Sequence, residues 1–342
     1  MATYGFRVHT MEPHVRRTEK FLQIEDAAGA GGEADACDQM YRELLELQGI
    51  LNIGTPTYFV DEQSEEIRAA ALEAANDLAY FLVHKVNRDG RVLEVIVETG
   101  KEADHDALAS RDGTHEEMTR RAPVRRSTVV FAFPEKGGTA IMLSDVRGRN
   151  YAGQLLIQWL TRTAQRANVQ VTEKGKKEEP WLNWKLTPQI DGERLDGVLS
   201  GSSEHTLKLR RRYVNAQGGR ASFDLELVQF GLKKTGKDAF LAVVLGMADR
   251  RNKGTEAARR AAAAVDVITL VDPDVAGVGF NDGELSFSEN GKVQTVNAET
   301  VDRLFVYPTG SVKLDPTELR KKAAAVVGRI ALASNVEVTV AV

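Results

Sequence analysis

Apolar residues recur with helical spacing in four stretches of this chain. In the first stretch, the apolar residues Met40, Leu44 and Leu47 lie at positions i, i+4 and i+7. Asp38 precedes them and is a residue type that favours the start of a helix. A helix with such a stripe buries one face and leaves the other in water. The spacing predicts four helices, at residues 38–51, 64–90, 151–167 and 316–334.

Shorter apolar or alternating runs bounded by glycine, proline and asparagine predict β-strands. Residues 128–133 and 139–143 flank a turn-forming segment from Pro134 to Gly138 and therefore predict a hairpin. A second hairpin is predicted around Asn290-Gly291, because this dipeptide supplies the positive φ angles of a two-residue turn. The other predicted strands are residues 3–8, 21–24, 57–60, 92–97, 181–186, 205–214, 221–230, 240–245, 267–271, 284–288, 292–296 and 336–342.

This order of elements predicts an α+β protein of two domains, each a mainly antiparallel sheet with packed helices, joined by a hinge. The first domain is expected at residues 1–167, with a charged surface excursion at 101–126. A polar, lysine-rich run at 168–182 is the expected linker and hinge. Residues 183–342 are expected to form a strand-rich basic domain with a C-terminal helix.

Composition restricts the class of protein further. The 342 residues are 42% hydrophobic and 27% charged, which is enough to bury a sizeable core. Cys37 is the only cysteine, so neither an intrachain disulfide nor a cysteine-rich zinc site can form. Because the sequence has no long apolar run and no signal-peptide pattern, we expect a cytoplasmic protein that does not insert into a membrane.

Positive charge is concentrated in the third quarter of a chain whose formal net charge is −4. Such concentration is typical of proteins that bind a polyanion, because each neutralised phosphate releases counterions. The predicted DNA-binding residues are Lys208, Arg210, Arg212, Lys233, Lys234, Arg250, Arg251, Arg259 and Arg260, with Arg147 and Arg149 as possible additions.

The first three of these residues alternate along one predicted strand. Lys208, Arg210 and Arg212 would lie on one face of a sheet about 6.6 Å apart, close to the spacing of phosphates along a nucleic-acid strand. Aromatic residues are scarce around the basic groups, so contact with a duplex backbone is favoured over stacking on unpaired bases.

Two other classes of function stay open. A divalent-metal nuclease could use Asp224 and Glu226 with Lys233, or Glu94 and Glu98 with Lys101, although the first pair also fits the solvated face of an amphipathic strand. A protein-interaction or phage-sensing module would carry the same basic clusters as solvated surface. The sequence lacks a phosphate-binding loop, a paired histidine motif and a nucleophile elbow, so no catalytic residue, metal or cofactor is predicted.

The layout of residues 120–335 also bears a likeness to a known family. It consists of the hairpin at Val129 to Leu143, an Arg-Gly turn, an amphipathic helix and a basic strand-rich half that ends in the Ser288 to Lys292 hairpin and a terminal helix. This layout resembles the RexA-like proteins of prophage exclusion. The resemblance implies a homodimer that binds double-stranded DNA, with two hinged domains, acting in abortive-infection defence against phage beside a small membrane effector protein.

Overall fold

The computed structural model shows an α+β fold and describes about half of the chain. The described residues are 4–16, 22–26, 35–53, 79–101, 107–109, 115–117, 124–147, 150–172, 175–178, 180–189, 194, 202–214, 220–228, 282–289, 292–297, 306–333 and 336–338.

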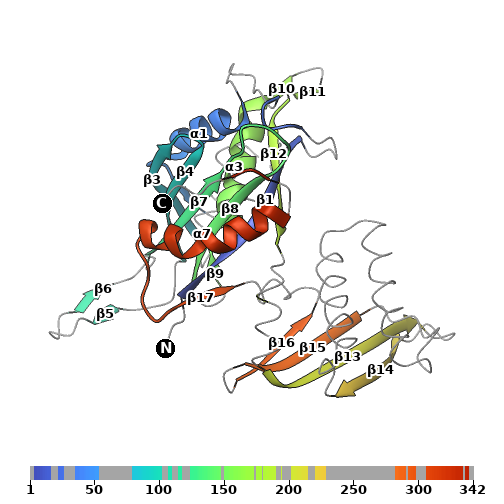
Figure 1. The fold of residues 1–342 in the computed structure, drawn as a ribbon. Helices are drawn as coiled ribbons and strands as arrows, with labels where there is room; N and C mark the ends of the chain where they lie inside the picture. The colour runs from blue at the N-terminus through green and yellow to red at the C-terminus, as the bar shows by residue number, and fades with distance from the viewer. Residues whose placement is uncertain are drawn as a thin grey trace. The chain divides into compact units, whose positions relative to one another are not determined.

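A nine-stranded sheet forms the centre of the larger unit (Figure 1). Neighbouring strands from β1 through β8, β7, β4 and β3 to β2 pair antiparallel. β12 and β17 both pair with β1, and β9 pairs with β8. In sheet order the strands are β12 (Leu182–Pro188), β1 (Tyr4–Val15), β8 (Ala140–Arg147), β7 (Val124–Ala132), β4 (Val92–Lys101), β3 (Ala79–Asp89) and β2 (Leu51–Ile53), with β17 (Tyr307–Gly310) and β9 (Asn150–Tyr151) beside this path.

Three helices cover the two faces of this sheet. α1 (Ala36–Leu47) and α3 (Gly153–Asn168) pack against β3 and β8 and share one hydrophobic core with the sheet. α7 (Pro316–Ala333) contacts β1 and β8, and its Arg320 lies 3.6 Å from Glu94. Glu94 alternates along β4 with the core residues Leu93 and Val95, so α7 covers the opposite face.

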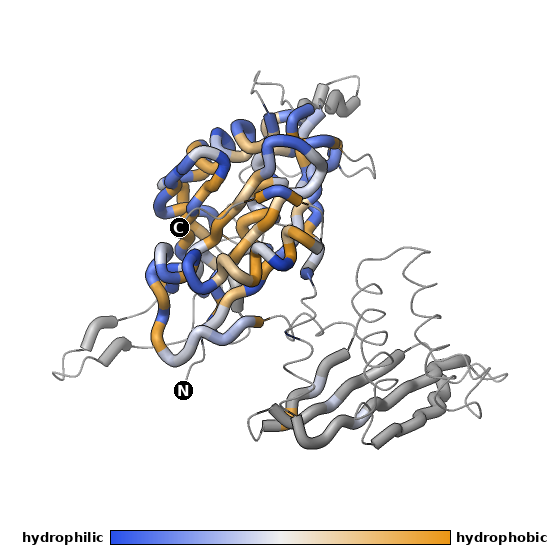
Figure 2. The backbone as a smooth tube through the Cα atoms, in the orientation of Figure 1, coloured by the Kyte–Doolittle hydropathy of each residue, from blue (hydrophilic) through white to orange (hydrophobic). Residues whose placement is uncertain are grey.

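The core between the sheet and the first two helices is made of large apolar side chains. Phe81 of β3 stacks on Trp159 of α3 with ring centroids 6.0 Å apart, and Phe131 and Met142 are fully buried on neighbouring strands. Each such side chain stabilises the fold by roughly 1.5–3 kcal/mol through burial. Figure 2 shows the same pattern along the backbone, with hydrophobic residues inside this unit and hydrophilic residues at its turns.

The structure groups the chain differently from the predicted boundaries. One compact unit contains residues 1–187 and 308–342, and the other contains residues 188–307. The predicted strand at 181–186 is β12 of the nine-stranded sheet, and the C-terminal helix packs on that sheet. The reason is that the apolar stripe of α7 (Leu319, Ala323, Val327 and Ile330) is buried in the first unit.

The second unit contains a four-stranded antiparallel sheet. Its strand order is β14-β13-β15-β16, and both predicted hairpin strands around Asn290-Gly291 belong to it. The strands are β13 (Ser202–Val214), β14 (Arg220–Val228), β15 (Asp282–Glu289) and β16 (Lys292–Asn297).

Several local predictions are also corrected. Residues 79–89 of the predicted helix 64–90 are the strand β3, and the rest of that helix lies outside the described residues. The predicted linker contains a hairpin of β10 (Val169–Thr172) and β11 (Gly175–Glu178), and the excursion contains the paired strands β5 (Ala107–Ala109) and β6 (His115–Glu117). Residues 22–24 and 336–338 are not strands, and the predicted strands at 57–60, 240–245 and 267–271 lie outside the described residues.

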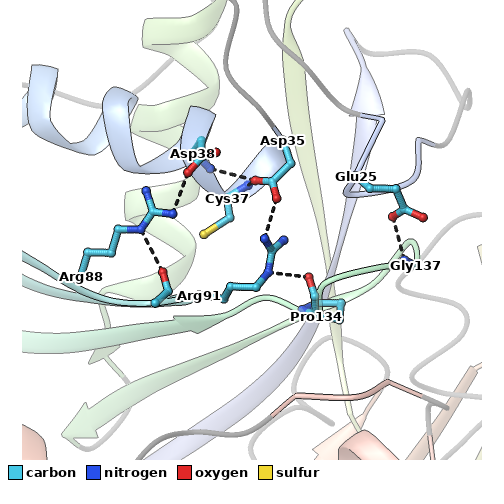
Figure 3. Close-up of polar contacts among 9 residues, drawn as sticks. Glu25, Asp35, Cys37, Asp38, Arg88, Arg91, Pro134 and Gly137 are labelled. Atoms are coloured by element: carbon cyan, nitrogen blue, oxygen red, sulfur yellow. Dashed lines mark hydrogen bonds and ion pairs between the residues drawn. The ribbon is translucent and has the colours of Figure 1, made fainter.

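The N-terminus of α1 is tied to the β3–β4 turn by ion pairs (Figure 3). The Asp35 side chain caps the helix by accepting hydrogen bonds from the amides of Cys37 and Asp38, three residues before the predicted start. Its other oxygen lies 2.6 Å from Nη1 of Arg91, and Asp38 lies 2.6 Å from Nη2 of Arg88. Burial raises the pKa of the Cys37 thiol to about 11, so this cysteine is held as an uncharged core residue.

We expect Asp35→Ala to lower the free energy of unfolding by about 2 kcal/mol, because the change removes both a helix cap and a partly buried ion pair. Asp35→Asn keeps a capping oxygen and loses only the charge, so it should lower stability less. Urea titration of both variants measures the difference. Equal stability of Asp35→Ala and the parent protein would contradict this role.

Candidate functional site

The predicted basic strand is flanked by acidic residues in the sheet register. β13 runs between β14 and β15, and Lys208 pairs with Glu226 on one side and Glu284 on the other. Arg210 pairs in the same way with Asp224 and Asp282. Directly paired residues share one face of an antiparallel sheet. Around these two cations the strand is therefore part of a mixed-charge face.

The third cation of this strand has a different neighbour. Arg212 pairs with Ser222, so no acid lies directly opposite it on β14. Arg147 is exposed at the end of β8. The remaining predicted DNA-binding residues lie outside the described residues; they are Arg149, Lys233, Lys234, Arg250, Arg251, Arg259 and Arg260.

The structure gathers a basic cluster around Arg147, which we define as Arg125, Arg126, Arg147 and Lys313. Nη1 of Arg125 donates to the Arg147 carbonyl oxygen at 3.4 Å, and Nζ of Lys313 donates to the Arg126 carbonyl oxygen at 2.7 Å. The four residues come from β7, β8 and the segment before α7. Pairing of the central strands therefore brings together cations that are far apart in the sequence.

One buried acid lies among these cations. Asp145 of β8 is 7% exposed, and neither of its carboxylate oxygens has a hydrogen-bond partner that meets the usual geometry within the described residues. Burial raises the pKa of the Asp145 carboxyl, and this effect is offset only in part by the Thr128 amide, Lys313, Arg125 and Ser127. Burial also lowers the pKa of Arg125, which Asp145 raises and the neighbouring Arg147 lowers further.

A second acid is paired to the edge of the cluster. Oε1 of Glu98 lies 2.7 Å from Nε of Arg126, with which Glu98 is in register between β4 and β7, and 3.6 Å from Nδ1 of His84. The guanidinium of Arg147 lies over the Tyr4 ring, 5.6 Å from its centroid. Arg126, Arg147 and Lys313 are all exposed, so the cluster presents excess positive charge to solvent.

Glu94 and Glu98, predicted as one possible nuclease site, do not form a metal site within the described residues. Glu94 and Glu98 are four positions apart on one strand, about 13 Å, which is too far to share one ion. Each instead lies beside an arginine, Arg320 or Arg126. Asp224 and Glu226 pair in register with cations of β13, and Lys233 lies outside the described residues. No group of three or more candidate ligand side chains gathers among the residues that the structure describes.

Sequence reasoning missed Arg125, Arg126 and Lys313. The first two were assigned to the charged excursion at 101–126, although they directly precede the first strand of the predicted hairpin. A hairpin places the residues before its first strand beside those after its second, so the runs Arg125-Arg126 and Arg147-Gly-Arg149 were the available signal. No local pattern indicates that Lys313 joins them.

Comparison with protein-family models, curated proteins and solved structures finds no match to this chain. Among the described helices, none combines the length and the apolar character that a membrane span requires.

We expect Asp145→Asn to stabilise the protein at pH 8. A carboxyl whose pKa is raised in the folded protein contributes its full stability only at a pH where it is protonated in both the folded and the unfolded protein. This stability is lost as the pH rises through the pKa of the folded protein. The advantage of Asp145→Asn should therefore shrink as the pH falls toward the ordinary carboxyl pKa near about 4.

Urea unfolding at several pH values from 8 to 4.5 measures this dependence. Glu46→Gln removes an exposed carboxyl of α1 and is the control for the loss of one negative charge. A stability difference that grows as the pH falls would contradict the assignment.

Proposed function

We propose that this protein binds double-stranded DNA through its phosphate backbone, without reading the base sequence. The observation that carries the proposal is the basic cluster of Arg125, Arg126, Arg147 and Lys313, in which cations from three chain segments converge around a single buried acid. Like charges held this close repel one another, and a bound anion relieves the repulsion. Arginine and lysine side chains supply the usual donors to phosphate oxygens.

A backbone grip fits the cluster better than stacking on bases does. The ring of Tyr4 lies under the Arg147 guanidinium of the cluster. Stacking of unpaired bases needs open aromatic faces. The cluster thus offers cations for phosphates in place of a platform for bases.

The role of the strand-rich unit is secondary in this proposal. Lys208 and Arg210 each have two acids in register, which weakens their attraction for a polyanion, whereas Arg212 faces a serine on β14. The basic residues from Lys233 to Arg260 add to the positive charge of this unit in sequence. Movement between the two units would allow both to contact one duplex.

The biological setting of the proposal rests on the resemblance to RexA-like proteins. It includes a cytoplasmic location, a homodimer, action in prophage-encoded defence and a small membrane effector as partner. Co-purification from phage-infected cells and sedimentation of the purified chain test these parts separately from DNA binding.

A protein-interaction module is the second candidate. The observation that favours it is the alternation of acids and bases across β14, β13 and β15, which suits a partner of mixed charge more than a polyanion. This reading predicts no nucleic-acid binding even at low salt.

Substituting Arg147→Ala and Lys313→Ala together should weaken duplex binding and reduce the slope of log K against log salt by about two, because roughly one counterion is released per phosphate contact. Gel-shift titration at several salt concentrations measures both quantities. The matched control is Arg42→Ala with Lys85→Ala, which removes two exposed cations from α1 and β3.

Two further results distinguish the candidates. Arg210→Ala with Arg212→Ala should weaken binding less than the cluster variant does, because Arg210 has acids in register on both sides. Unchanged duplex affinity in a folded Arg147→Ala, Lys313→Ala protein would exclude the cluster as the binding surface. Absence of any shift by the parent protein at low salt would exclude the DNA-binding proposal.

A further inference from the structure

Arg125 and Asp145 leave buried polar atoms without partners inside the basic cluster. Nη2 of Arg125 is buried and makes no hydrogen bond within the described residues. Both carboxylate oxygens of Asp145 are buried as well, and no hydrogen bond to them meets the usual geometry, although the Thr128 amide and the Ser127 hydroxyl lie near enough to favour the charged form. Buried polar groups in proteins are nearly always hydrogen-bonded, so orphaned atoms of this kind call for a bound water or ligand. Here one donor has no partner, and two acceptors have none at the usual geometry.

These atoms belong to one electrostatic group. The charge of Asp145 acts on Arg125, and the charges of Arg125 and Lys313 act on Asp145, yet no hydrogen bond joins either cation to the carboxylate. Arg147 lies beside Arg125, because Nη1 of Arg125 donates a hydrogen bond to the carbonyl oxygen of Arg147. A third chemical group placed among them could accept from the cations and meet the carboxyl at the same time.

A phosphate group has the required chemistry. Its oxygens accept hydrogen bonds from guanidinium and ammonium groups, and one oxygen can share a proton with a carboxyl group. A water molecule could fill the same hydrogen bonds, but it would leave three cations with one acid as their counter-charge. A carboxylate has two acceptor oxygens and carries one negative charge, whereas a phosphate group has more oxygens and carries up to about two negative charges, so phosphate matches three cations better.

We propose that Arg125, Arg147 and Lys313 bind one phosphate group that shares a single proton with the Asp145 carboxyl. The proposal deepens the proposed function, since the same cluster would contact DNA, and the phosphate can come from a duplex backbone or from a free or terminal phosphate. The proton lies between a carboxylate oxygen and a phosphate oxygen. A phosphomonoester can bring this proton itself, whereas a phosphodiester or sulfate must take it up from solvent.

The groups that face Asp145 leave this carboxyl as the main source of pH dependence. Ser127, Thr128 and Arg125 from β7 and Lys313 before α7 act on Asp145 directly, and Arg147 from β8 and Tyr4 from β1 act on Arg125. Lysine, arginine and tyrosine side chains ordinarily titrate above about pH 9. Histidine side chains in general change charge between about pH 5 and 8. Because His84 lies beside Glu98 at the edge of the cluster, His84→Gln serves as a control variant.

The first arm of the experiment uses inorganic phosphate and sulfate in calorimetric titrations of the full chain at pH 6.5. The parent protein should bind phosphate about tenfold more tightly than sulfate, because only phosphate brings its own proton at this pH. In Asp145→Asn the amide can donate to either anion, and the preference should disappear. Glu94→Gln removes another largely buried acid of the sheet and should keep the preference.

The second arm measures duplex binding from pH 5 to 8. Parent affinity should fall by up to tenfold per pH unit, as expected for uptake of one proton, and Asp145→Asn should remove this dependence while His84→Gln keeps it. Arg125→Lys keeps the charge but loses the orphaned Nη2, and it should weaken phosphate binding in the first arm.

The two arms separate this inference from the proposed function. A phosphate preference that depends on Asp145, without duplex binding, supports the site for free phosphate and excludes the DNA proposal. Duplex binding whose pH dependence is unchanged in Asp145→Asn, together with no preference between phosphate and sulfate, overturns the phosphate site and leaves the DNA proposal in place. Binding of neither anion by a folded parent protein also overturns it.

Discussion

The pairing of β7 with β8 at the centre of the nine-stranded sheet is the constraint on which this structure depends. Both strands are buried along most of their length, since α1 and α3 lie on one face of the sheet and α7 on the other. A shift of one residue in their register would exchange the residues of the two faces. The pairing thus fixes the core and, at the open end of the hairpin, the positions of Arg125 and Arg147.

The same constraint explains why the cluster can hold like charges together. The strands carry their own backbone hydrogen bonds and apolar contacts, and these contributions exceed the repulsion among a few exposed cations. Asp145 lies on the strand that ends in Arg147, and burial makes its charged form unfavourable. The fold therefore supplies an excess of donors where the hairpin opens. In the four-stranded sheet, by contrast, the register supplies each of two cations with its own acids.

Most of the regular elements could be predicted from local pattern, and the failures have physical causes. The hairpin of β7 and β8 has clear turn residues, and the stripes of α3 and α7 follow the helical period. The sequence predicts a helix over β3 because Leu78, Phe81 and Leu82 fit the helical period. Pairing with β4 makes residues 79–89 a strand, and this long-range contact leaves no signal in the local spacing. α1 begins at Ala36, two residues earlier than predicted, because Asp35 and not Asp38 caps it.

The sequence by itself determined the α+β class, the central hairpin, the terminal helix and the presence of concentrated basic residues, because these depend on periodicity and composition along a few neighbouring positions. Tertiary structure alone decided which sheet β12 and α7 join, and which acids stand opposite the cations of β13. It also decided that Lys313 contacts Arg126 and acts on Asp145 together with Arg125. These outcomes depend on the register between strands and on packing between segments from nearly opposite ends of the chain, such as α7 and β1. The local sequence pattern does not determine these long-range contacts. The charge of a segment therefore does not reveal which charges will face it in the fold.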